Sequence, residues 1–206
     1  MSSERKRAII VIDVQEEYFS GNLKIQYPDP ILSLNNIHKI IDFSTEQGIP
    51  VVIVKNILSP ESPLFSVSGK YTNLVNSIEE RKRDLYIEKQ LPSVFSNEDF
   101  DHWLKSNGID TLVITGYMTH NCDDSTVKHA FHLGYHVELI SDATGSVPYS
   151  NEAGEATAEE IHRVLCVVNQ ARFAAVLSTD QWLECVKDQR LPVRSSIHAS
   201  HQQAIC

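Results

Sequence analysis

The sequence contains no apolar run that approaches the roughly 20 residues needed to cross a bilayer. The apolar stretch from Ala8 to Ile12 follows several basic residues, but Asp13 ends it early. This stretch also lacks the small-residue cleavage site of a secretory signal peptide. We therefore expect a first strand at these residues, a cytoplasmic protein and no membrane contact.

Basic residues are scarce. Lys and Arg total 18 against 27 Asp and Glu, which gives a formal net charge of −9. The one basic run, residues 81–83, stands beside two glutamates. A protein that binds nucleic acid normally presents the opposite charge balance, so we expect no nucleic-acid partner. The four cysteines are widely spaced and form no CxxC pair, which predicts free thiols in a reducing compartment.

Several common motifs are missing from the chain. There is no GxGxxG or GxxxxGK[ST] segment for a dinucleotide or a phosphate, and no GxSxG elbow for a serine hydrolase. His129, His132 and His136 are close in sequence, but no HExxH or paired His/Cys spacing accompanies them. We interpret them as surface histidines and expect no metal and no cofactor.

What the chain does contain is a regular alternation of short β-branched runs and helical patterns. This alternation predicts a parallel sheet covered by helices on both faces, a three-layer α/β fold in one domain over residues 1–191. Residues 192–206 are predicted to be a polar tail or an oligomer arm. Residues 58–71 have no clear period and fit a lid or an ordinary surface loop. The expected strands are residues 8–12, 50–54, 85–87, 112–114, 137–140 and 174–177.

Helix signals separate these strands. A capping box is predicted at Ser96 and Asp99 and another at Thr157 and Glu160. The helix after Thr157 is expected to turn four apolar side chains inward, Ile161, Val164, Leu165 and Val168.

Three residues that can carry chemistry follow predicted strands: Asp13, Lys89 and Cys122. Parallel sheets bind ligands beyond the carboxyl ends of their strands, so these side chains are expected to converge there. A thiol in the first turn of a helix is favoured as thiolate, and a carboxylate near it can accept its proton. Each residue also has a purely structural interpretation: a small buried thiol, a carboxylate that ties down a loop, and a solvated ammonium.

The chain resembles the isochorismatase-like cysteine hydrolase superfamily over about residues 7–187. The resemblance rests on RAIIVIDVQEEYF, IEKQLPSVF, LVITGYMTHNCDDSTVKHAFHLGYHVELISDAT and FAAVLSTDQWL, which occur in the family's order. It implies a six-stranded parallel sheet, a three-layer α/β/α sandwich, and an Asp/Lys/Cys triad at Asp13, Lys89 and Cys122. It further implies a cis peptide between Tyr117 and Met118, with the backbone N–H groups of Met118 and Cys122 as the oxyanion hole.

The same resemblance places Gln15, Phe19, Phe95 and Tyr117 near the substrate, and it implies a homo-oligomer, a dimer or a tetramer. Family nicotinamidases carry an Asp-x-His metal segment where this chain has residues 54–58, VKNIL, so a metal-dependent nicotinamidase is disfavoured. Asp123 stands where an apolar residue is frequent and adds a charge beside Cys122.

These features predict a cysteine hydrolase that cleaves a C–N amide or ureido bond of a small molecule through a thioester. Members that hydrolyse the vinyl ether of isochorismate commonly lack the cysteine, so retention of Cys122 favours amide chemistry. Three alternatives stay open at this point. They are vinyl ether hydrolysis with Asp13 as the acid, a non-catalytic binding module, and redox sensing at Cys122.

Overall fold

A computed structural model describes residues 5–206 and is built around a parallel sheet of six strands. Their spatial order is β3-β2-β1-β4-β5-β8, and each neighbouring pair is parallel. All six strands predicted from the apolar runs are confirmed, and so is the three-layer α/β/α fold. The strands are Arg7–Ile12 (β1), Val51–Asn56 (β2), Leu85–Lys89 (β3), Thr111–Tyr117 (β4), His136–Gly145 (β5) and Ala175–Leu177 (β8).

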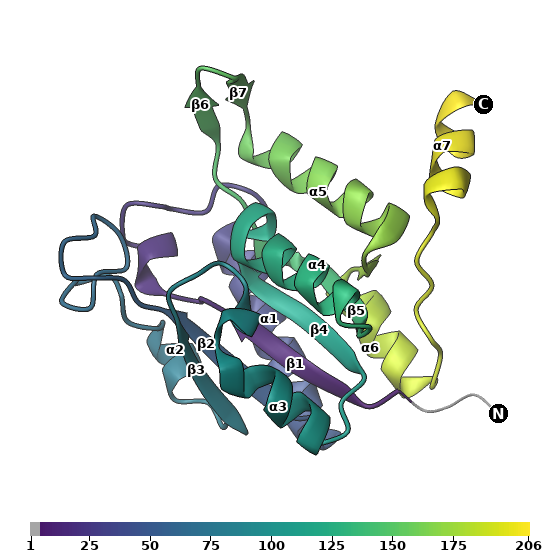
Figure 1. Ribbon diagram of the computed structural model, residues 1–206, viewed down its shortest axis with the longest axis horizontal. Coiled ribbons are helices and arrows are strands. Elements are labelled where there is room, and N and C mark those ends of the chain that lie inside the picture. Colours follow the sequence, from purple (N-terminus) through teal and green to yellow (C-terminus); the bar gives the residue numbers. More distant parts are fainter. Residues whose placement is uncertain (1–4) are drawn as a thin grey trace.

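Helices cover both faces of the sheet, which is why β1 is apolar at successive positions. Its alternate side chains enter different cores, Ile9 and Val11 on one face and Ile10 and Ile12 on the other. In Figure 1, α3 and α4 lie in front of the sheet and α1 lies behind it. The main helices are Pro30–Glu46 (α1), Glu98–Ser106 (α3), Asp124–His132 (α4), Ala158–Arg172 (α5) and Thr179–Lys187 (α6).

Shorter elements complete the chain. A two-stranded antiparallel hairpin, β6 and β7, extends beyond the carboxyl end of β5. The short elements are Glu16–Tyr18 (η1), Asn76–Glu79 (α2), Val94–Ser96 (η2), Thr119–Asp123 (η3), Tyr149–Asn151 (β6), Gly154–Ala156 (β7) and Ile197–Ile205 (α7).

The helix caps agree with the sequence patterns in one case and differ in another. The capping box of Thr157 and Glu160 is present at the start of α5. The box predicted at Ser96 and Asp99 is wrong, because Ser96 belongs to η2. The neighbouring Asn97 caps α3 instead, with its side chain accepting from the N–H of Asp99.

The predicted inner face of α5 is also wrong. Val164 and Val168 are 47% and 42% exposed, whereas two polar residues, His162 and Asn169, are buried. His162 bonds the hydroxyl of Thr119 at 2.9 Å, and the Asn169 amide donates to Asp124 at 3.1 Å. The buried face of α5 packs through polar contacts with η3 and α4. The apolar periodicity of the sequence therefore did not indicate which face of the helix is buried.

The segments left uncertain by the sequence now have definite structures. Residues 197–205 of the predicted tail form α7, which has no buried side chain and stands beside α5 in Figure 1. Within the 58–71 segment, Phe65 is buried with its ring 5.4 Å from that of Tyr18. The division between a 1–191 domain and a tail stays a prediction. None of the helices in residues 5–206 is long and apolar enough to cross a membrane.

The strand order creates one place where the winding of the sheet reverses. The chain adds β2 and β3 on one side of β1, then returns to add β4, β5 and β8 on the other. The carboxyl ends of β1 and β4 therefore flank a switch point, where open α/β sheets bind their ligands.

Candidate active site

Asp13 follows β1 at this switch point. Its backbone has a φ of 51°, a left-handed conformation that aspartate adopts more readily than most residues. Its N–H donates to the carbonyl oxygen of Val54 at the end of the neighbouring strand, 3.0 Å away. The side chain is completely buried. The turn thus places a carboxyl group at the end of the sheet and out of contact with water.

Lys89, the last residue of β3, reaches across to this carboxyl group. Its Nζ donates to Oδ2 of Asp13 at 2.7 Å and to Sγ of Cys122 at 3.3 Å. The two charged side chains form an ion pair with no solvent exposure. The structure therefore brings all three predicted chemical residues into one cluster, although they come from three separate segments.

Cys122 lies in η3, a turn of π-helix that leads directly into α4. Its carbonyl accepts a hydrogen bond from the hydroxyl of Thr126 at 2.7 Å. The same hydroxyl accepts from the N–H of Val94, 3.1 Å away on η2. Thr126 thereby connects the segment that carries the thiol to the segment that follows Lys89.

The backbone before Cys122 has the implied form. The peptide between Tyr117 and Met118 is cis, as the resemblance predicts. Gly116 precedes it with a φ of +111°, and a Cβ at this position would lie 2.0 Å from the carbonyl oxygen of Ile12. Only glycine fits so close to β1.

Burial controls the protonation of the cluster. Desolvation raises the pKa of Asp13, and the Lys89 ammonium opposes the rise. Burial alone would lower the pKa of Lys89, but Asp13 and Cys122 hold it above its ordinary value. Burial and the charge of Asp13 raise the pKa of the Cys122 thiol, with Lys89 opposing them. Burial therefore opposes the thiolate that the start of the helix favours.

Asp123 is the second buried carboxyl group next to the thiol. It is fully buried, and neither of its oxygens has a hydrogen-bond partner among the described residues. Burial, with the charge of Asp13 adding to it, raises the pKa of Asp123 well above its ordinary value. Its environment therefore favours the neutral acid over the second negative charge that the sequence suggested.

The residues predicted to contact substrate have other partners in this structure. The Gln15 amide bonds the backbone N–H and carbonyl of Asn56, at 2.8 and 2.9 Å, and the carbonyl of Thr72 at 2.6 Å. Gln15 thus joins the loop after β1 to the end of β2 and to the 58–72 segment. Its substrate-binding role stays a prediction.

The aromatic candidates pack against one another and against the core. The Tyr117 hydroxyl lies 2.6 Å from the Ser33 hydroxyl, and the Phe19 ring meets the Tyr117 ring edge-on at 5.6 Å. Phe95 packs on Phe100, with ring centroids 4.8 Å apart. Substrate contacts by Phe19, Phe95 and Tyr117 also stay predictions, as does the oxyanion hole at Met118 and Cys122.

The sequence analysis did not select His120 and Tyr149, whose rings meet edge-on at 5.0 Å. His120 Nδ1 bonds Ser146, while its buried Nε2 has no partner among residues 5–206. Burial lowers the pKa of His120 to about 4. Burial and the charge of Cys122 raise the pKa of Tyr149. The only available sequence signal was the position of His120 in the loop before the cysteine.

No group of three or more His, Cys, Asp or Glu side chains in the described part of the chain is arranged to hold a metal ion. The chemical groups present at the switch point are therefore a thiol, two carboxyl groups and an ammonium. Together they can support attack by sulfur with proton transfer to an adjacent carboxylate.

Comparison with known proteins agrees with this assignment. The crystal structure of a protein from Burkholderia xenovorans LB400, described as a "putative isochorismatase", is 52% identical, covers 98% of this chain and 97% of its own, and has a TM-score of 0.96. The isochorismatase family protein YddQ of Bacillus subtilis is 28% identical over 86% of this chain and 98% of its own length.

The ureidoacrylate amidohydrolase RutB of Variovorax paradoxus is 37% identical over 66% of this chain and 68% of its own length. Residues 7–181 match the family model of the isochorismatase domain. That match covers most of the chain, including the strand ends that carry Asp13, Lys89 and Cys122, and the chain therefore belongs to the isochorismatase family of hydrolases.

Proposed function

We propose that this isochorismatase-family hydrolase cleaves the C–N bond of a small amide or ureido compound through a thioester on Cys122. The observation that supports this most strongly is the contact of one ammonium, Lys89, with both Asp13 and Cys122, at 2.7 and 3.3 Å. A cluster of this kind supplies a nucleophile, a base and a fixed countercharge without any other group.

The first half of the reaction forms the thioester. Asp13 takes the thiol proton as sulfur attacks the substrate carbonyl carbon. In the proposed reaction the oxyanion that develops accepts from the backbone N–H groups of Met118 and Cys122, and a donor of this type contributes about 3 kcal/mol. Asp13 then gives its proton to the leaving nitrogen, the C–N bond breaks, and ammonia or a small amine departs.

The second half regenerates the thiol. A water molecule gives a proton to Asp13 and adds to the thioester carbonyl carbon. The tetrahedral intermediate collapses, the C–S bond breaks, and the proton on Asp13 returns to sulfur. One water is consumed, and a carboxylic or carbamic acid is released with the amine.

Lys89 makes these proton transfers possible in a dry site. When the proton moves from sulfur to Asp13, one negative charge moves from the carboxylate to the sulfur. Because Lys89 contacts both atoms, its attraction to that charge changes little during the transfer. Without Lys89, the negative charge on Asp13 or on the sulfur would be buried without a countercharge, which is energetically costly.

Amide chemistry explains the site better than vinyl ether hydrolysis does. Acid-catalysed cleavage of a vinyl ether requires Asp13 as a proton donor but gives no role to the sulfur. In this chain Cys122 is present, buried and bonded to the Lys89 ammonium. The relationship to RutB, named a ureidoacrylate amidohydrolase, supports the same choice.

A substrate panel tests the proposal. Small linear amides, ureido acids and isochorismate are incubated with the protein, and ammonia and pyruvate are measured. We expect ammonia or amine release from at least one amide or ureide, loss of that activity in Cys122→Ala, and retention in Cys206→Ala, whose thiol is exposed at the chain end. Pyruvate release from isochorismate alone, or full amide turnover by Cys122→Ala, would overturn it.

A further inference from the structure

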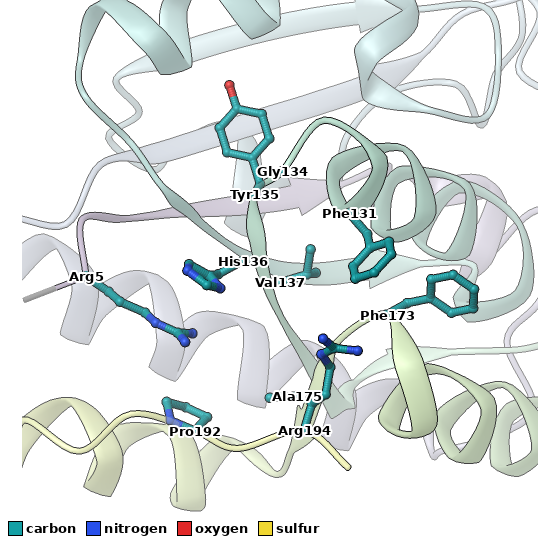
Figure 2. Close-up of a pocket in the computed structure, with 10 residues that line it drawn as sticks. All are labelled: Arg5, Phe131, Gly134, Tyr135, His136, Val137, Phe173, Ala175, Pro192 and Arg194. Carbon is teal, nitrogen blue, oxygen red and sulfur yellow. The ribbon is translucent and has the colours of Figure 1, made fainter. Parts of the chain in front are cut away.

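A cavity lies at the opposite edge of the sheet from Cys122. It has a volume of about 240 Å³ and is enclosed by the starts of β5 and β8 and the segment that follows α6 (Figure 2). Cys122 follows β4 at the carboxyl ends of the strands, whereas His136 begins β5. The seven residues of β4, whose ends Thr111 and Tyr117 pair with the ends of β5, separate the two edges by roughly 20 Å at about 3.3 Å per residue. The cavity is therefore separate from the candidate active site.

Three nitrogen-rich side chains border this cavity: Arg5, His136 and Arg194. In Figure 2 the Arg5 guanidinium lies between His136 and Pro192, and the Arg194 guanidinium lies near the aromatic side of the cavity. Two guanidinium groups at one cavity are unexpected in a chain with a net charge of −9. Charge of one sign concentrated in a concave site attracts ligands of the other sign.

The nearby acidic groups leave these cations incompletely neutralised. Glu138 is 3.8 Å from Arg5, but it already accepts from Arg7 at 2.9 Å and from the Trp182 indole at 2.8 Å. Arg194 donates to the backbone carbonyl of Arg172, and no carboxylate within the described residues pairs with it.

The pKa of His136 responds both to burial and to these charges. Burial lowers its pKa, and the charges of Arg5 and Arg194 lower it further, while Asp110 and Glu138 oppose them. Burial is the largest of these effects on the imidazole, and the charge of Arg5 is the next. An anion bound among these groups would reverse that effect.

The remaining wall is apolar and partly aromatic. The Phe131 and Phe173 rings meet edge-on with centroids 5.4 Å apart, and the Arg194 guanidinium lies 5.3 Å from the Phe131 ring centre. Val137, Ala175 and Pro192 complete this side. Flat apolar surfaces beside a guanidinium suit a planar group that carries an anion at one end.

We propose that this cavity binds a small anion with a flat apolar group, an aromatic carboxylate, whose charge lies between Arg5 and Arg194 and whose ring packs on the Phe131 and Phe173 side. The site is independent of the proposed hydrolase reaction and of Cys122. Because Pro192 and Arg194 belong to the segment after α6, a bound anion would also join this segment to the start of β5.

Binding of benzoate to the full chain tests the proposal, measured by calorimetry and by NMR of the His136 imidazole. We expect saturable binding with a Kd in the millimolar range or below, and a rise in the pKa of His136. Benzamide, which lacks the charge, and acetate, which lacks the ring, should each bind at least tenfold more weakly. Equal binding of either compound, or no change at His136 on saturation, would overturn the proposal.

Matched variants locate the site. Arg194→Gln and Arg5→Gln should each weaken benzoate binding at least fivefold. Arg190→Gln removes the same charge from the same region, but the Arg190 side chain pairs with Glu184 and Asp188 outside the cavity. This variant should therefore bind benzoate as tightly as the wild type. If Arg194→Gln and Arg190→Gln bind benzoate with equal affinity, benzoate binds outside this cavity, for example at the carboxyl ends of the strands near Cys122. That result would refute the assignment.

Discussion

Asp123 offers a test of the buried electrostatics that does not depend on knowing the substrate. Its carboxyl group is fully buried without a hydrogen-bond partner among residues 5–206, and its pKa is raised well above 3.8. The native state therefore keeps a proton that the unfolded chain releases as the pH rises past that value. Asp123→Asn keeps the size and neutrality of the protonated side chain, and it removes this titration.

The magnitude follows from one proton. In the window above 3.8 where native Asp123 stays protonated, the free energy of unfolding of the wild type falls by about 1.4 kcal/mol per pH unit through this group alone. The asparagine variant lacks that loss. Its stability relative to wild type should thus increase by about 1.4 kcal/mol for each pH unit of that window, and the two proteins should converge toward pH 4.

Urea unfolding of both proteins at pH 5, 6 and 7 measures this difference, and titrating groups that do not interact with Asp123 cancel in the comparison. Asp180→Asn serves as the control, because Asp180 is exposed on α6 and should change stability by less than about 0.5 kcal/mol at every pH. A difference for Asp123→Asn that stays constant from pH 5 to pH 7 would show that Asp123 is ionised in the native protein. That result would refute the reasoning.

Two further substitutions test the construction of the site. Lys89→Met leaves the buried carboxylate of Asp13 without its countercharge; urea unfolding at pH 7 should show a loss of about 3–5 kcal/mol, and a loss below about 1 kcal/mol would contradict the buried ion pair. Gly116→Ala places a methyl group 2.0 Å from the carbonyl oxygen of Ile12. We expect a loss of at least about 3 kcal/mol, and unchanged thermal stability would contradict this packing.

The sheet and the central cluster were predictable because both depend on local signals. Strands buried on both faces read as continuous apolar runs, and Asp13 stands out because it ends such a run. Once the strands are known to be parallel, the positions of Asp13, Lys89 and Cys122 at strand ends place them on one edge.

The features that the sequence did not predict depend on partners far along the chain. The inner face of α5 carries His162 and Asn169, whose burial is understandable only from Thr119 and Asp124. The three backbone contacts of Gln15 have the same origin. The burial that raises the pKa of the Cys122 thiol was also not predictable, because a helix start is visible in a sequence whereas the depth of burial is not.

The central claim is that the sulfur of Cys122 becomes covalently acylated during turnover. Rapid acid quenching of the protein with a confirmed amide or ureide substrate, followed by mass spectrometry of the intact chain and its peptides, measures this directly. We expect a transient acyl adduct on the peptide that contains Cys122, with none on Cys206 and none in Lys89→Met. Turnover without an adduct in the wild type, accompanied by full turnover in Cys122→Ala, would contradict it.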